Sequence, residues 1–101
     1  MKLSEIPRHE AGEGLEEYLR HVLNTPSVSI GDLARWLDVQ RTALCKIQAG
    51  GGASIDTITK FGALTGVLER TPARIETLNL FGVLESAEAG WAMRAKLLAE
   101  N

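Results

Sequence analysis

The chain has 101 residues, of which 45% are hydrophobic and 24% are charged, and its formal net charge is −2. This length is that of about one domain, which excludes most multidomain enzymes, and the composition is typical of a globular protein. The single cysteine, Cys45, excludes an internal disulfide and a paired-cysteine metal site.

Charge is unevenly distributed along the chain. Residues 1–17 contain two basic and five acidic residues. Residues 18–74 contain seven basic and four acidic residues, and residues 75–101 contain two basic and four acidic residues. A basic middle therefore lies between acidic ends. No apolar run approaches the roughly 18–20 residues that cross a bilayer, and the first residues include acids where a signal peptide is apolar. We therefore expect a cytoplasmic protein without a membrane span.

The first predicted helix covers residues 13–24. Its apolar residues recur three and four positions apart, which places them on one helix face: Leu15, Tyr18, Leu19, Val22 and Leu23. Asn24, Thr25 and Pro26 follow and are expected to end the helix.

Two shorter helices are predicted over residues 30–37 and 41–48. Ser29 can cap the first of them, and Asp38 is expected to end it in a left-handed turn, a conformation that aspartate tolerates. The apolar positions expected to form the core of this pair are Leu33, Ala34, Leu37, Val39, Leu44 and Ile47. Trp36 is expected to lie partly outside the core, against a neighbouring helix or a partner subunit.

A fourth helix is predicted between Ser54, which can cap it, and Gly66, which can end it. Its inward-facing residues are expected to be Ile55, Ile58, Phe61 and Leu64. Thr71 and Pro72 then form a favourable start for a fifth helix running to about Phe81.

Ser86 is expected to cap a sixth helix that continues to the end of the chain. For residues 78–84 a strand is the alternative, although hydrophobic alternation there is poor. The sequence thus predicts an all-α protein of five or six helices.

The pair of helices over residues 30–37 and 41–48 has the length and the tight connection of a helix-turn-helix. The segment SIGDLARWLDVQRTALCKIQAG resembles the second and third helices of the lambda-repressor/Cro-like (XRE-type) regulators, and SIDTITKFGALTGV resembles their fourth helix. The family usually has glycine where Asp38 stands, and many members have glutamine where Ile30 stands. The resemblance covers residues 13–67. It implies a lambda-repressor-like domain of four to five helices, followed over residues 68–101 by a helical dimerisation extension.

The resemblance also implies that the helix over residues 41–48 enters the major groove of double-stranded DNA. Arg41 and Lys46 can donate to guanine, Thr42 can contact thymine, and Gln40 can bond adenine or a phosphate. Cys45 shares this face, either as a small residue near the groove or as a thiol whose oxidation weakens binding. The alternative for the whole face is an ordinary solvated helix surface.

Three consecutive glycines, Gly50 to Gly52, follow this helix. Gly51 and its neighbours can offer backbone N–H groups to a phosphate, together with Ser54 at the start of the next helix. A flexible turn explains the glycines equally well. Because no GK[ST] follows them and no strand precedes them, nucleotide hydrolysis is not predicted.

The apolar residues beyond the shared domain are expected to make dimer contacts: Ile75, Leu78, Phe81, Trp91, Leu97 and Leu98. The predicted function is that of a homodimeric repressor from a phage, a plasmid or a bacterial chromosome. It would occlude promoters at an inverted-repeat operator with half-sites about 34 Å apart. The alternative is the antitoxin of a toxin–antitoxin pair, in which the acidic residues 10–17 bind a protein partner.

The two histidines, His9 and His21, lack acidic or cysteine partners at metal-ligand spacing and are expected to be isolated surface residues. No set of side chains suggests catalysis. The sequence therefore predicts no enzyme activity, no metal and no cofactor.

Overall fold

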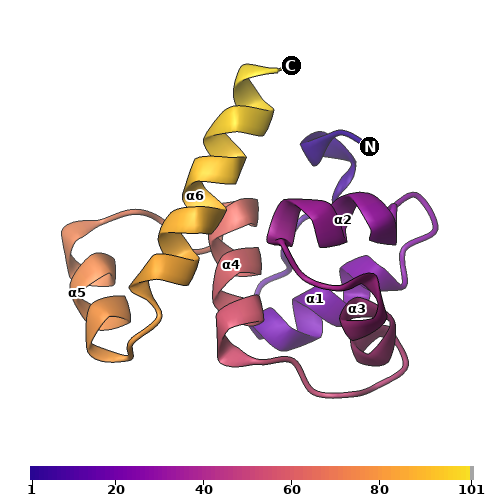
Figure 1. Cartoon of the computed structure of the whole chain (residues 1–101), viewed down its shortest axis with the longest axis horizontal. Helices are drawn as coiled ribbons and strands as arrows, with labels where there is room; N and C mark the ends of the chain where they lie inside the picture. The colour runs from indigo at the N-terminus through magenta and orange to yellow at the C-terminus, as the bar shows by residue number, and fades with distance from the viewer. Residues whose placement is uncertain (101) are drawn as a thin grey trace.

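The computed structural model describes residues 1–100. These residues form a short 3-10 turn and six α-helices: η1 (Leu3–Glu5), α1 (Leu15–Leu23), α2 (Ile30–Leu37), α3 (Arg41–Gln48), α4 (Ile55–Thr65), α5 (Pro72–Leu80) and α6 (Leu84–Ala99) (Figure 1). The all-α prediction is confirmed, and residues 78–84 contribute to two helices and the turn between them instead of a strand. Among the described residues, no helix is long and apolar enough to cross a membrane.

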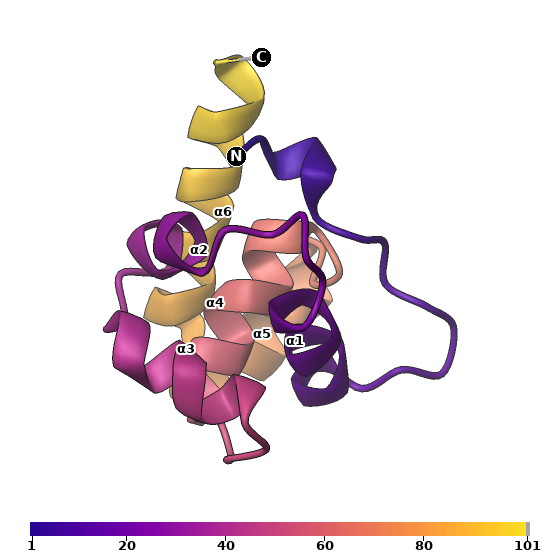
Figure 2. The same ribbon diagram turned by 90° about the vertical axis from the view of Figure 1, so that its right-hand side faces the viewer.

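Helix α4 lies at the centre of the fold. Helices α1, α2 and α3 lie on one side of it, α6 crosses the other side, and α5 lies beyond α6 at the edge of the molecule (Figure 1). The turn η1 lies beside the second half of α6 (Figure 2). The main core joins α1, α2, α3 and α4, and its largest fully buried side chains are Leu19, Val22, Leu33, Leu37, Leu44, Phe61 and Leu64.

A second, smaller cluster fixes α5 and α6 to α4. It consists of Ala63, Leu78, Val83 and Ala87, with Leu84 and Trp91 packed against it. Because Leu78 is the one buried residue of α5, that helix is attached along a narrow line of contact.

The predicted helix ends at α2, α4 and α5 are confirmed. Ser29 accepts a hydrogen bond from the Asp32 N–H and Ser54 from the Thr57 N–H, both at 3.2 Å, which satisfies N–H groups that lack partners in a first helical turn. Asp38 adopts the left-handed conformation (φ 52°, ψ 50°), as does Gly66 after α4. Local chemistry therefore determines these boundaries.

The predicted start of α6 is wrong. Gly82 has a positive φ of 72°, and the Val83 N–H donates to the Leu78 carbonyl at 3.0 Å, so the chain reverses at once and α6 begins at Leu84. Ser86 lies inside the helix, where its hydroxyl donates to Asp56 at 2.8 Å and links α6 to the start of α4. Helix α1 is also shorter than the predicted span of residues 13–24.

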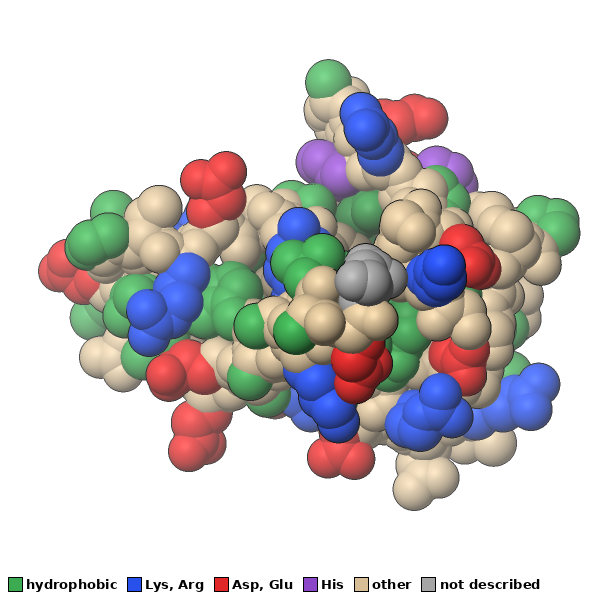
Figure 3. Space-filling view, turned by 90° about the horizontal axis from the view of Figure 1, so that it is seen from above, with side chains coloured by type: hydrophobic (Ala, Val, Ile, Leu, Met, Phe, Trp, Pro, Cys, Tyr) green, Lys and Arg blue, Asp and Glu red, His purple; other side chains and the backbone are tan. Residues whose placement is uncertain are grey.

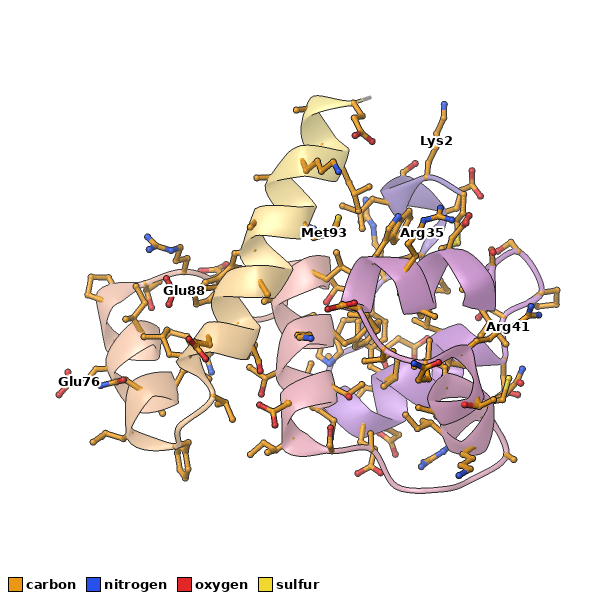
Figure 4. The ribbon with its side chains drawn as sticks, viewed as in Figure 1. Lys2, Arg35, Arg41, Glu76, Glu88 and Met93 are labelled. Atoms are coloured by element: carbon orange, nitrogen blue, oxygen red, sulfur yellow. The ribbon has the colours of Figure 1, made fainter. Side chains whose placement is uncertain are left out.

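Three burial predictions need correction. Ile55 is 58% exposed, because it is the first residue of α4 and helical side chains tilt toward the N-terminal end of their helix. Trp36 is buried, with 9% exposure, because Leu3 joins its cluster and Met93 of α6 packs against that cluster from the side facing α2 (Figure 4). Val39 is half-buried where a buried residue was expected.

Candidate nucleic-acid interface

The turn between α2 and α3 determines which way α3 faces. The Val39 N–H donates to the Ala34 carbonyl at 3.0 Å, which closes the end of α2, and extended backbone at Gln40 then leads into α3. Leu44 and Ile47 are buried against the main core. The side of α3 opposite these two residues must therefore face solvent.

Four of the predicted DNA-contacting residues share this solvent side, which we call the α3 face: Arg41, Thr42, Cys45 and Lys46. All four are exposed, and so is Gln40, which precedes the helix. Gln40 makes no side-chain cap to α3, so its amide is also available to a ligand. The structure thus brings the predicted residues of this helix onto one surface. Arg41 lies at the opposite end of the long axis from Glu76 of α5 (Figure 4).

The two cations of the α3 face differ from the neighbouring arginines in having no acidic partner. Within residues 1–100, neither Arg41 nor Lys46 has a carboxylate oxygen within 4 Å. Arg35, by contrast, pairs with Asp32 at 2.9 Å, and Arg20 lies 3.6 Å from Glu16. The α3 face therefore presents positive charge that the described part of the fold does not neutralise.

Helix α1 holds the end of α3 through contacts that the sequence analysis missed. Arg20 donates to the Ile47 carbonyl at 3.3 Å and to the Gly51 carbonyl at 3.2 Å. Gln48 donates to the Leu23 carbonyl at 2.8 Å. The spacing of Glu16 and Arg20 predicts their ion pair, but no feature of the sequence indicates the contacts with α3.

The prediction that Gly51 offers its amide to a phosphate is wrong. Its N–H donates to the Lys46 carbonyl at 2.9 Å, and the Gly50 N–H donates to the Ile47 carbonyl at 3.0 Å, so both amides serve to end α3. A Cβ at position 51 would lie 2.9 Å from that Lys46 oxygen, which explains why glycine suits the position. Ser54 is exposed, but its hydroxyl is engaged with Thr57 at the start of α4.

The predicted dimer residues fall into three groups. Leu78 is buried in the second cluster and is not available to a partner, which corrects its assignment. Ile75, Trp91 and Leu97 are half-buried, and the Trp91 indole N–H donates to the Leu68 carbonyl at 2.7 Å. Phe81 and Leu98 are 71% and 49% exposed, and the unpredicted Leu80 is 81% exposed. Hydrophobic side chains are visible at the α5 end in Figure 3.

The two histidines are not isolated, contrary to the prediction. The His21 Nδ1 lies 3.2 Å from a Glu13 carboxylate oxygen, and the His9 Nε2 bonds to the Glu13 carbonyl. Both rings lie near Tyr18, with centroids at 5.0 Å for His9 and 6.4 Å for His21. Figure 3 shows both histidines at one edge of the molecule. Within residues 1–100, no group of three or more potential ligands is suited to a metal ion.

Comparison of the chain with protein families, with curated proteins and with solved structures gives no match. Three observations about α3 therefore bear on function: its polar residues are exposed, its cations have no acidic partner within residues 1–100, and Arg20 and Gln48 hold its end against α1.

Proposed function

We propose that the chain is a sequence-specific DNA-binding protein with a lambda-repressor-like helix-turn-helix, acting as a homodimeric transcriptional repressor. The observation that carries the proposal is the α3 face, where Arg41 and Lys46 are exposed without acidic partners while Leu44 and Ile47 anchor the helix from below. The major groove of B-DNA is about 12 Å wide and admits one α-helix. An α-helix with its side chains is about 10–12 Å in diameter, so the exposed helix α3 can enter this groove.

The side chains of the α3 face match the chemistry of base edges. An arginine can donate two hydrogen bonds to guanine, a lysine can donate to the same acceptors, and threonine can contact a thymine methyl group. Residues near the start of the helix approach the bases in helix-turn-helix proteins, which assigns the most specific contact to Arg41. Arg20 and Gln48 would hold the other end of α3 against α1 during binding.

The size of the molecule favours repression by occlusion. Its principal extents are 35 × 32 × 27 Å, so one copy spans about one turn of B-DNA, roughly 34 Å. Two copies related by a two-fold axis would cover two adjacent turns and would bind an inverted repeat. Such a complex blocks a promoter without a separate regulatory domain.

Selection from a randomised duplex library at about 0.15 M salt tests the proposal. We expect enrichment of an inverted repeat with half-sites about one helical turn apart, bound at least about 10³-fold more tightly than random DNA. A folded protein that enriches no sequence would reject the proposal and favour a protein partner.

The reactivity of the single thiol, that of Cys45, tests whether DNA binds at the α3 face. Cys45 is exposed, so a thiol reagent should modify it readily in the free protein and much more slowly in the complex with selected DNA. The matched control is the double variant Cys45→Ser and Glu76→Cys, whose thiol lies at the far end of the molecule and should stay equally reactive with and without DNA (Figure 4). Equal reactivity of Cys45 in both states would remove α3 from the interface.

A further inference from the structure

A pocket of about 210 Å³ lies where α4 ends, at the opposite end of that helix from the loop that joins it to α3. Residues 6–9 form one wall, and Tyr18, Thr65, Gly66, Val67 and Arg94 form others. The Tyr18 hydroxyl donates to the Pro7 carbonyl at 2.6 Å and fixes the wall to α1. The pocket is thus built from the amino-terminal segment, α1, α4 and α6.

Three basic residues line this pocket. They are Arg8, His9 and Arg94, and no acidic residue lines the pocket. Arg94 donates from Nη1 to the Leu64 carbonyl at 3.1 Å, and within residues 1–100 no carboxylate lies within 4 Å of its guanidinium. Because an arginine has five N–H donors, this contact leaves Arg94 with donors for a ligand.

Gly66 makes room for the Arg94 guanidinium. A Cβ at this position would lie 2.9 Å from the Arg94 Cζ, and the residue has a φ of 81° that favours glycine. The carbonyl end of a helix disfavours anions, but Arg94 already donates to one of these carbonyls and adds a full positive charge. The positive charge of Arg94 therefore favours an anion beside its guanidinium, although the Glu13 carboxylate acts in the opposite direction at Tyr18.

The remaining walls suit an apolar ring. Leu3, Ile6, Pro7 and Val67 contribute aliphatic surface, and the Tyr18 and His9 rings meet edge to face at 5.0 Å. An apolar cavity of about 150 Å³ is enough to bind benzene, whereas sites for drug-sized ligands start at about 300 Å³. A pocket of 210 Å³ therefore fits a single ring with one small substituent.

We propose that this pocket binds a small ring-bearing carboxylate, with the carboxylate at Arg94 and Arg8 and the ring between Tyr18 and Val67. This ligand site goes beyond the proposed DNA-binding function and uses none of the residues of the α3 face. Its test contains no DNA, so its failure is separate from a failure of the DNA-binding proposal.

Benzoate is the probe, titrated into the ¹⁵N-labelled full chain at pH 7 and constant ionic strength. We expect saturable shifts at the Gly66 and Val67 amides with a Kd in the millimolar range, and no shifts in α3. Benzamide, which has the same ring without the charge, should bind at least about tenfold more weakly, because a charge-assisted hydrogen bond is roughly twice as strong as a neutral one. No saturable shift, shifts located elsewhere, or equal binding of benzamide would overturn the proposal.

Two variants test the assigned arginines. Arg94→Met and Arg8→Met should each weaken benzoate binding about tenfold. Arg94→Met also removes a hydrogen bond to α4, which can impair folding. Arg8 is exposed, so Arg8→Met tests the site without that effect. Arg74→Met is the matched control, because Arg74 is exposed on α5 and lines neither this pocket nor the neighbouring hollow that shares Gly66 and Arg94 with it. Unchanged affinity in Arg8→Met, or an equal loss in Arg74→Met, would contradict the proposed contacts.

Discussion

Gly90 of α6 lies directly against the Lys60 carbonyl of α4. A Cβ added to Gly90 would be 2.5 Å from that oxygen and 2.7 Å from the Ala63 Cβ, closer than real Cβ atoms approach. The two helices that make the most extensive contact in the fold therefore cross at a position where only glycine fits without a shift.

Gly90→Ala should lower the free energy of unfolding by about 1–3 kcal/mol, because overpacking against backbone outweighs a gain in helix propensity of about 1 kcal/mol. Urea denaturation measures the change. Gly31→Ala is the matched control. A Cβ added to Gly31, which lies in α2, would have the Ser29 Oγ at 3.9 Å as its nearest neighbour, so that variant should be as stable as the wild type or more stable. A stabilised Gly90→Ala variant would show that α4 and α6 do not cross this closely.

The pKa of Tyr18 should lie above its ordinary value. Burial raises the pKa of the phenol above 10.0, and the Glu13 carboxylate raises it further, while Arg94 acts in the opposite direction. The folded state thus favours the neutral phenol. The contribution of the neutral Tyr18 phenol to the free energy of unfolding is complete below about pH 10 and is lost as the pH rises through the folded-state pKa.

This titration can be followed directly, since the chain has only one tyrosine. Absorbance of the phenolate should have its midpoint above pH 10 in the native protein and near 10 in urea. A native midpoint at or below the unfolded one would contradict the buried hydrogen bond of Tyr18 to the Pro7 carbonyl.

Arg41→Ala should cost about 1–3 kcal/mol in binding to the selected operator and should relax the preference at one base pair. Lys46→Ala tests whether Lys46 contacts a phosphate. In that case, binding to all sequences weakens alike, and the slope of log K against log salt falls by about one. Arg74→Ala, on exposed α5, is the control and should change neither quantity. Equal losses on operator and random DNA in Arg41→Ala would contradict its base contact.

The two exposed members of the predicted dimer set can be tested separately. A charge in a desolvated contact is costly, so Phe81→Glu or Leu98→Glu should shift the proposed homodimer toward monomer in sedimentation equilibrium while leaving the monomer folded. Leu97→Glu is a poorer test, because Leu97 packs against the main core and its loss would also impair folding. Dimers unchanged in both exposed variants would reject the carboxyl-terminal interface.

Local features allowed the limits of α2 and α4 to be predicted. Ser29, Asp38, Ser54 and Gly66 each act within a few residues, so their effect on the backbone can be inferred from neighbouring sequence. The apolar spacing of Leu44 and Ile47 likewise predicted which side of α3 is exposed.

Contacts between distant segments could not be predicted in this way. The burial of Trp36 depends on α6 and η1, and the surroundings of His9 and His21 depend on how residues 7–13 fold over α1. A glycine in a sequence also does not reveal its role: Gly51 ends α3, whereas Gly90 allows two helices to cross. Such roles depend on neighbours that only the tertiary fold brings together.

The closeness of the first and last described turns has a practical consequence. Met1, Lys2, Leu3, Leu97 and Glu100 line one shared hollow, and η1 lies beside the end of α6 (Figure 2). A short linker can therefore join these ends, and the chain can be opened at the exposed turn of Phe81 and Gly82 to create new termini. The resulting circular permutant would keep α4 and α6 together while reversing their order in the chain.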